Sequence, residues 1–173
     1  LAAGADFVSA KEGIRMNQHL LSVLVNNHPG LLSKVSGLFS RRGFNIESLA
    51  VGVCEKPGCS RMTIVVNGDE RVVDQVMKQL DKLIDVLEIE RLPTEEAVQR
   101  ELILVKVRAD IRQRQDVIQI AEIFRARIVD VAALGLTLEL TGTDDKLSAL
   151  ISLLEPYGIE QIMRTGLVAV RRF

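Results

Sequence analysis

The chain has 173 residues, of which 47% are hydrophobic and 26% charged, and its formal net charge is −1. That length suits one large domain or two small ones with a buried core. The near-neutral charge gives no general attraction to nucleic-acid backbones or acidic membranes, and an aromatic content of 3% leaves few platforms for base stacking. No apolar run reaches the roughly 20 residues of a membrane helix. We therefore expect a soluble protein that binds neither nucleic acid nor a membrane.

Residues 1–17 lack the cationic start and apolar block of a secretory signal, and we interpret them as a flexible lead-in. The two cysteines, Cys54 and Cys59, bracket the turn sequence "CEKPGC". A metal site would need more ligands nearby, and the two histidines, His19 and His28, are remote in sequence. The cysteines suit a disulfide across a hairpin, but so low a count favours a reduced intracellular chain.

From residue 20 onward, the chain alternates strand and helix patterns. The apolar run "LLSVLVN" predicts a strand, and a helix with one apolar face follows (Leu31, Leu32, Val35, Leu38 and Phe39). A hairpin of "NIESLAVGV" and "SRMTIVVN" comes next, with Pro-Gly at its tip. A second helix capped by Asp69 and a closing strand "DVLEIERL" complete the pattern.

The same order then occurs a second time. Segment 137–154, "TLELTGTDDKLSALISLL", matches segment 63–80, "TIVVNGDERVVDQVMKQL", in a strand, a glycine, a capping residue and a helix. The apolar positions of the two helices coincide at Val73/Leu147, Val76/Leu150, Met77/Ile151 and Leu80/Leu154. Around this segment lie "LILVKVR", a helix, the hairpin "RIVDVAA" with "LTLELTG", and the closing strand "EQIMRTGLVAV". The sequence therefore indicates a duplicated β-α-β-β-α-β unit.

Two such units predict an α+β fold with two ferredoxin-like βαββαβ domains, each with both helices on one face of an antiparallel sheet. We place the first domain at residues 18–92, a polar linker at 93–97 and the second domain at 98–173. The other face of each sheet is left open. Because "LLSVLVN" and "LILVKVR" look too apolar for exposed sheets, we expect the chain to associate rather than remain a monomer.

The first strand–helix join is where the two halves differ. Asn27, Pro29 and Gly30 lead into a helix whose first amides lack intrahelical partners, and such an end attracts a carboxylate. An asparagine can serve an ammonium and a carboxylate at once. With Asn45 after the helix, polar groups are expected to converge at the ends of apolar elements. The same residues also suit ordinary turns and caps, and spacing alone leaves the two interpretations evenly balanced. The second join, "RADIRQRQDV", has neither Gly nor Asn.

Several stretches together resemble the regulatory (small) subunit of acetohydroxyacid synthase, also called acetolactate synthase. They are "VNNHPGLLSKVSGLFSRRGFNIESLAVG", "SRMTIVVNGDE", "QLDKLIDVLEI", "RELILVKVRA", "EIFRARIVDV", "ELTGTDDKL" and "RTGLVAVRR". The resemblance implies an N-terminal amino-acid-binding ACT domain, a C-terminal ACT-like domain, and valine, leucine or isoleucine bound at an ACT dimer interface. Its ligand positions fall on Asn27, Gly30 and Asn45. The full expected set is Asn27, His28, Pro29, Gly30, Leu31, Leu32, Asn45 and Ile46.

The resemblance also implies a function and partners. The chain would be a non-catalytic homodimer that activates a catalytic (large) subunit and makes it sensitive to a branched-chain amino acid. Thiamine diphosphate, FAD and Mg²⁺ would belong to that subunit, and the location would be the bacterial cytoplasm or a plastid stroma. His28 and Pro29 stand where other members often carry acidic or small residues, which leaves the preferred amino acid open.

Three other functions are less consistent with the residues. An acylphosphatase-like enzyme needs an arginine in the first join, and "NNHPG" has none. An RNA-recognition module needs stacking aromatics on its central strands, which "SRMTIVVN" lacks. A free-standing two-ACT regulator of another system is the alternative that the fold permits, and the resemblance in the second half disfavours it.

Overall fold

In the computed structural model, which describes residues 18–173, the chain forms two compact units. The described residues up to Val98, together with Ala169–Phe173, make the first unit, and Gln99–Val168 make the second. The expected lead-in at residues 1–17 lies outside the described residues.

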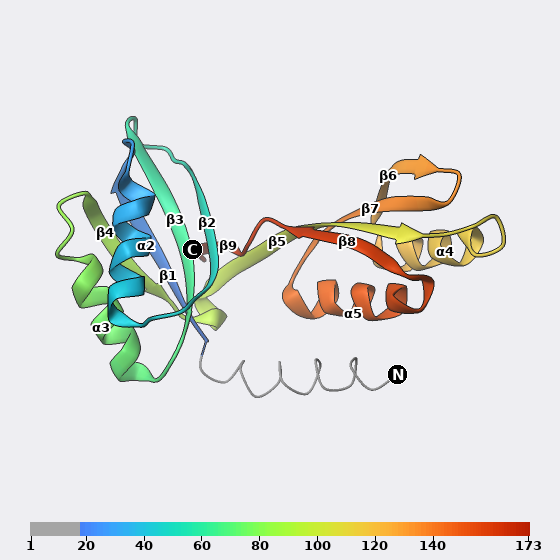
Figure 1. The fold of residues 1–173 in the computed structure, drawn as a ribbon. Helices are drawn as coiled ribbons and strands as arrows, with labels where there is room; N and C mark the ends of the chain where they lie inside the picture. The colour runs from blue at the N-terminus through green and yellow to red at the C-terminus, as the bar shows by residue number, and fades with distance from the viewer. Residues whose placement is uncertain (1–17) are drawn as a thin grey trace. The chain divides into compact units, whose positions relative to one another are not determined.

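The first unit is a four-stranded antiparallel sheet with two helices on one face (Figure 1). The strand order is β2-β3-β1-β4, the ferredoxin-like arrangement expected from the sequence. Its elements are β1 (Gln18–Asn26), α2 (Leu31–Arg42), β2 (Ile46–Val53), β3 (Cys59–Asn67), α3 (Glu70–Leu80) and β4 (Val86–Leu92).

The helix-facing side of this sheet carries the core. Alternate residues of β1, namely Leu21, Val23 and Val25, pack with the apolar stripes of α2 and α3. The opposite side is also shielded, because Leu20 and Leu24 of β1 and Val65 of β3 are almost fully buried. This burial agrees with the expectation that "LLSVLVN" is too apolar to lie open on either side.

The second unit repeats the arrangement, with strand order β6-β7-β5-β8 and helices α4 and α5. Its elements are β5 (Ala97–Arg108), α4 (Arg114–Phe124), β6 (Arg127–Ala132), β7 (Gly135–Gly142), α5 (Asp144–Leu154) and β8 (Ile159–Arg164). Here β5 alternates: Ile103, Val105 and Val107 are buried, whereas Lys106 and Arg108 are exposed. β5 therefore has one apolar face and one mixed face with Lys106 and Arg108, and the expectation that the chain associates stays a prediction.

The closing strand of the second half is not one strand. It stops at Arg164, and Gly166 adopts a positive φ of 79°, a conformation that glycine reaches without strain. The chain then forms β9 (Val168–Arg171), which pairs with β5. Residues from Ala169 onward, which the sequence assigned to the second domain, thus belong with the first unit.

The polar segment at 93–97 is a hydrogen-bonded turn rather than a free linker. Thr94–Glu96 form the 3-10 helix η1, and Glu96 accepts a backbone hydrogen bond from Arg172 at 2.7 Å. The guanidinium of Arg171 pairs with the carboxylates of Glu90 and Glu96. The C-terminal residues are therefore attached to the first unit through both backbone and charge.

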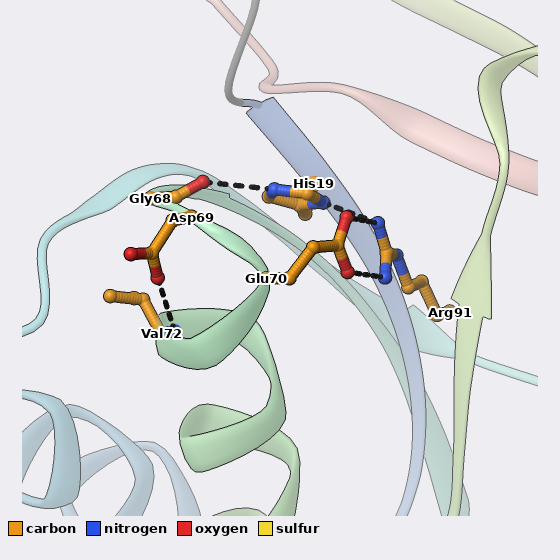
Figure 2. A network of polar contacts seen from close by, with 6 residues as sticks. All are labelled: His19, Gly68, Asp69, Glu70, Val72 and Arg91. Atoms are coloured by element: carbon orange, nitrogen blue, oxygen red, sulfur yellow. Dashed lines mark hydrogen bonds and ion pairs between the residues drawn. The ribbon is translucent and has the colours of Figure 1, made fainter.

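In each unit, an arginine on the last strand of the βαββαβ repeat contacts the first strand and the start of the second helix. In the first, Arg91 of β4 forms two bonds, of 2.5 and 2.8 Å, to Glu70 at the start of α3, and it donates to His19 Nδ1 of β1 at 2.8 Å (Figure 2). His19 Nε2 in turn donates to the Gly68 carbonyl at 2.9 Å. The pairing with Glu70 raises the pKa of Arg91 and lowers that of Glu70.

The second unit has an analogous contact. Arg164 of β8 bonds Glu101 of β5 at 2.7 Å and lies 3.6 Å from Asp144, the first residue of α5. The duplication thus extends from the fold to an ion pair that ties the last strand to the first strand and to the start of the second helix.

In the part of the chain that the structure describes, no helix is long and apolar enough to cross a membrane. Nor does any group of three or more His, Cys, Asp or Glu side chains in residues 18–173 come together as a metal site would require.

The two units offer a matched test of helix capping. Asp69 accepts a 2.9 Å hydrogen bond from the Val72 amide at the start of α3 (Figure 2), whereas Thr143, at the start of α5, makes no side-chain cap bond. We expect Asp69→Ala to cost about 1 kcal/mol of stability and to speed hydrogen exchange at Val72. Thr143→Ala should cost less. Urea unfolding measures the loss of stability, and amide exchange measures the change at Val72. Equal effects of the two substitutions would contradict the conclusion that only Asp69 caps its helix with a side-chain hydrogen bond.

Candidate functional site

The start of α2 is the first component of the candidate site. Gly30 is its N-cap residue, with a positive φ of 86°, and it offers no side chain to cap the helix. The first turn contains no acidic residue. Among the described residues, no acceptor bonds the amides of Leu32 or Ser33. This helix end therefore presents donors and a positive dipole to an anion.

Asp85, in the turn between α3 and β4, fixes the loop that precedes this helix. Its carboxylate accepts from His28 Nε2 at 2.7 Å and from Lys34 Nζ at 2.8 Å. Its backbone carbonyl accepts from the Asn26 amide at 2.9 Å. Asp85 is 8% exposed, so one nearly buried residue holds both sides of the join between β1 and α2.

The charges of this cluster support one another. His28 Nδ1 lies 2.9 Å from the Pro29 carbonyl and Nε2 faces Asp85, so only the protonated imidazole can donate to both. These two hydrogen bonds raise the pKa of His28. The hydrogen bonds from Lys34 and His28 lower the pKa of Asp85. The loop thus holds the Asp85 carboxylate between the ammonium of Lys34 and the imidazole of His28.

Asn27 lies at the same end of the sheet, exposed, with its backbone amide bonded to the Gly58 carbonyl of the β2–β3 turn at 2.8 Å. Asn45 lies at the opposite end. It precedes Ile46, which pairs with Val66 of β3, whereas the far end of β2, Val53, pairs with Ser60. The two pairs are seven positions apart along β2 and six along β3, about 20 Å. Asn27 and Asn45 of one chain therefore do not converge, contrary to the expectation from sequence.

The apolar members of the expected set divide between core and surface. Leu31 is 5% exposed and Ile46 packs against the core. Leu32 is 48% exposed, and Pro29 is exposed beside it. Leu32 is thus the apolar side chain next to Gly30 that is open to a ligand, while Leu31 anchors the helix.

The corresponding helix start in the second unit already holds a carboxylate. Asp110 accepts from the amides of Arg112 and Gln113 at 2.8 and 3.0 Å, just before α4 begins. Both donors precede α4, and the first turn of that helix also contains Asp116, whereas the first turn of α2 contains no acidic residue. The two strand–helix joins therefore differ both in sequence, since only the first contains glycine, and in the negative charge near the helix start.

Sequence reasoning missed Asp85, and it did not assign Lys34 a place beside the site. The two are separated by 51 positions, and Asp85 and His28 by 57. Asp85 could have been found from "KLIDVLEI", where it stands directly before the apolar strand β4. The strand β1 of the same sheet ends at Asn26, next to the predicted site. Adjacent antiparallel strands bring that turn to the same sheet end as the β1–α2 join.

Comparison with known proteins assigns the family. Residues 21–88 match the AHAS small subunit-like ACT domain, and residues 100–173 match the small subunit of acetolactate synthase. The chain is 52% identical over 155 residues to a probable acetolactate synthase small subunit of Archaeoglobus fulgidus, covering 90% of this chain and 97% of that protein. It is 53% identical to the acetolactate synthase small subunit of Mycolicibacterium smegmatis, covering 89% and 91%.

The fold comparison agrees. The crystal structure of the acetolactate synthase small subunit from Thermotoga maritima superimposes with a TM-score of 0.85 at 45% identity, covering 90% of this chain and 98% of that one. Identity of about half over nearly the full length, matches to both domain models and a common fold all point the same way. The chain belongs to the acetolactate synthase small-subunit family.

Proposed function

We propose that this protein is the regulatory subunit of an acetolactate synthase, that it activates the catalytic subunit, and that it confers feedback inhibition by a branched-chain amino acid. Small-subunit relatives along nearly the whole chain support the pairing with a catalytic subunit. We assign thiamine diphosphate, FAD and Mg²⁺ to that partner. The proposed effector-binding residues of this chain are Asn27, His28, Pro29, Gly30, Leu31, Leu32, Asn45 and Ile46.

The open helix start carries the proposal. The amides of Leu32 and Ser33 find no acceptor among the described residues, and Gly30 places no side chain in front of them. An α-carboxylate is the natural ligand for such donors. The amide oxygen of an asparagine can accept from the ammonium group, and Leu32 offers apolar contact to a branched side chain.

The distance between Asn27 and Asn45 requires two chains. If both contact one amino acid, Asn27 and Gly30 must come from one copy and Asn45 from another. In an isologous dimer, each such contact occurs twice, so two equivalent sites form across the interface. On this proposal the effector binds between subunits, and its binding depends on how the two chains are arranged.

Selectivity among valine, leucine and isoleucine follows from the size of the apolar pocket. One methylene distinguishes valine from its larger relatives, and a hydrophobic pocket discriminates by about 1–3 kcal/mol per methylene. Overlapping responses to the three amino acids are expected.

The test is reconstitution with an acetolactate synthase catalytic subunit. The chain alone should form no acetolactate, and adding it should raise the activity of the catalytic subunit several-fold. Valine, leucine or isoleucine should then inhibit the reconstituted pair but not the catalytic subunit alone. A chain that binds the subunit without changing its activity or its sensitivity to these amino acids would contradict the proposal.

Complementation tests the location of the site between chains. Asn27→Ala and Asn45→Ala proteins should each lose valine binding. Mixed and allowed to exchange subunits, they should form heterodimers in which one site has both asparagines and the other has neither. Random exchange restores about a quarter of all sites. Calorimetry should therefore measure about a quarter of the wild-type number of valine molecules bound per chain, each with the wild-type affinity. A site contained in one chain would show no recovery.

The Asp85 cluster predicts a pH dependence. Because its pKa is raised, His28 stabilises the folded loop fully below the ordinary value of 6.5 and loses this effect as pH rises through the raised pKa. Asp85, whose pKa is lowered, contributes above its ordinary 3.8 and loses this effect as pH falls through the lowered pKa. Asp85→Asn should therefore lower the pKa of His28, measured by NMR titration. Asp81→Asn, at the end of α3, is the matched control and should leave it unchanged.

A further inference from the structure

Cys54 and Cys59 lie on either side of the turn that joins β2 to β3, and both are partly exposed free thiols. Four residues, Glu55 to Gly58, separate them. The ladder of this hairpin ends with Val53 opposite Ser60. Cys54 and Cys59 are the next residues toward the tip, so the register of the ladder, continued by one step, sets them opposite each other.

A position opposite each other in a continued ladder is compatible with a disulfide. Opposed residues of an antiparallel pair have Cα atoms about 4.5–5.5 Å apart, within the range of about 4.4–6.8 Å that a disulfide spans. The Cys54 thiol donates to the Lys56 carbonyl at 3.8 Å, and the Cys59 amide donates to the same oxygen at 3.1 Å. The Cys54 sulfur and the Cys59 backbone thus contact the same carbonyl within the turn.

The same turn supports the candidate site. Gly58, immediately before Cys59, accepts the 2.8 Å hydrogen bond from the Asn27 amide, and Cys59 pairs with Asn26 in the β1–β3 ladder. The position of the Gly58 carbonyl depends on the turn conformation, since Gly58 has a positive φ of 75°. A covalent bond across the base of the turn would restrict that conformation and, with it, the Asn27 backbone.

We propose that Cys54 and Cys59 form a reversible disulfide that fixes the β2–β3 turn and its hydrogen bond to Asn27. The oxidant is a small-molecule disulfide of the glutathione type. One cysteine thiolate attacks it to give a mixed disulfide and one released thiolate, and the second cysteine then displaces the other. The two protein thiols lose two electrons and two protons, and the small disulfide is reduced to two thiols. The inference goes beyond the proposed function and does not depend on effector binding.

The experiment treats the full chain with oxidised glutathione and follows it by intact mass, free-thiol titration and amide exchange. We expect loss of both thiols and of the mass of two hydrogen atoms, with the protein unchanged in oligomeric size on a non-reducing gel. Exchange of the Asn27 amide should slow several-fold and recover with dithiothreitol. The Asn26 amide, which bonds Asp85 instead of the turn, is the internal control and should change little.

Cys54→Ser and Cys59→Ser are the matched variants. Each should stop at the mixed disulfide, with the added mass of one glutathione and without the slowed exchange at Asn27. Persistence of both thiols in the unmodified chain, cross-links between chains, or unchanged Asn27 exchange after oxidation would each overturn the proposal. None of these readouts requires valine or the catalytic subunit, so the proposed function is tested separately.

Discussion

The pairing of β3 with both β1 and β2 sets the geometry on which the proposed site depends. Through β3, the end of β1 at Asn26 lies level with the β2–β3 turn, and the start of β2 at Ile46 lies level with the start of β1. Reversing this relation would require a slip of several residues, which would remove Val23 and Ile64 from their places in the core. Hydrophobic packing thus keeps Asn27 and Asn45 at opposite sheet ends, and a site that used both would take them from two chains.

The two halves share a duplicated fold and differ at the proposed binding site. Both retain the sheet, the helix pair and an arginine from the last strand, Arg91 or Arg164, that meets a carboxylate at the start of the second helix. They differ at the start of the first helix. There α2 has Gly30 and no acidic residue in its first turn, whereas α4 has Asp110 in the preceding turn and Asp116 in its first turn. Carboxylates of the chain itself repel an external carboxylate, so the start of α4 is less suited to such a ligand than the start of α2.

The fold followed from sequence because its signals are local. The stripe from Val73 to Leu80, the cap at Asp69 and the glycine at the end of α2 each depend on neighbours within a turn or two of helix. What sequence could not supply depended on long-range geometry. The role of Asp85 requires contacts across more than 50 positions, and Ala169–Phe173 join the first unit only because the chain turns at Gly166. Leu31 and Leu32 looked alike, and only the helix phase separated the buried one from the exposed one.

An effector held between two chains can regulate only through a difference in affinity between two arrangements of those chains. The proposed interactions provide such a difference, because the helix-start donors come from one copy and Asn45 from another, and an arrangement that separates them weakens ligand binding. Each interaction with the ligand's charged groups is a charge-assisted hydrogen bond, worth about 1.5–3 kcal/mol. That is the scale of a typical allosteric coupling, about 1–3 kcal/mol. Breaking one such hydrogen bond per site is therefore sufficient to account for feedback, and no large change within either domain is needed. By reciprocity, a catalytic subunit that favours one arrangement must change the affinity for the effector by the same factor.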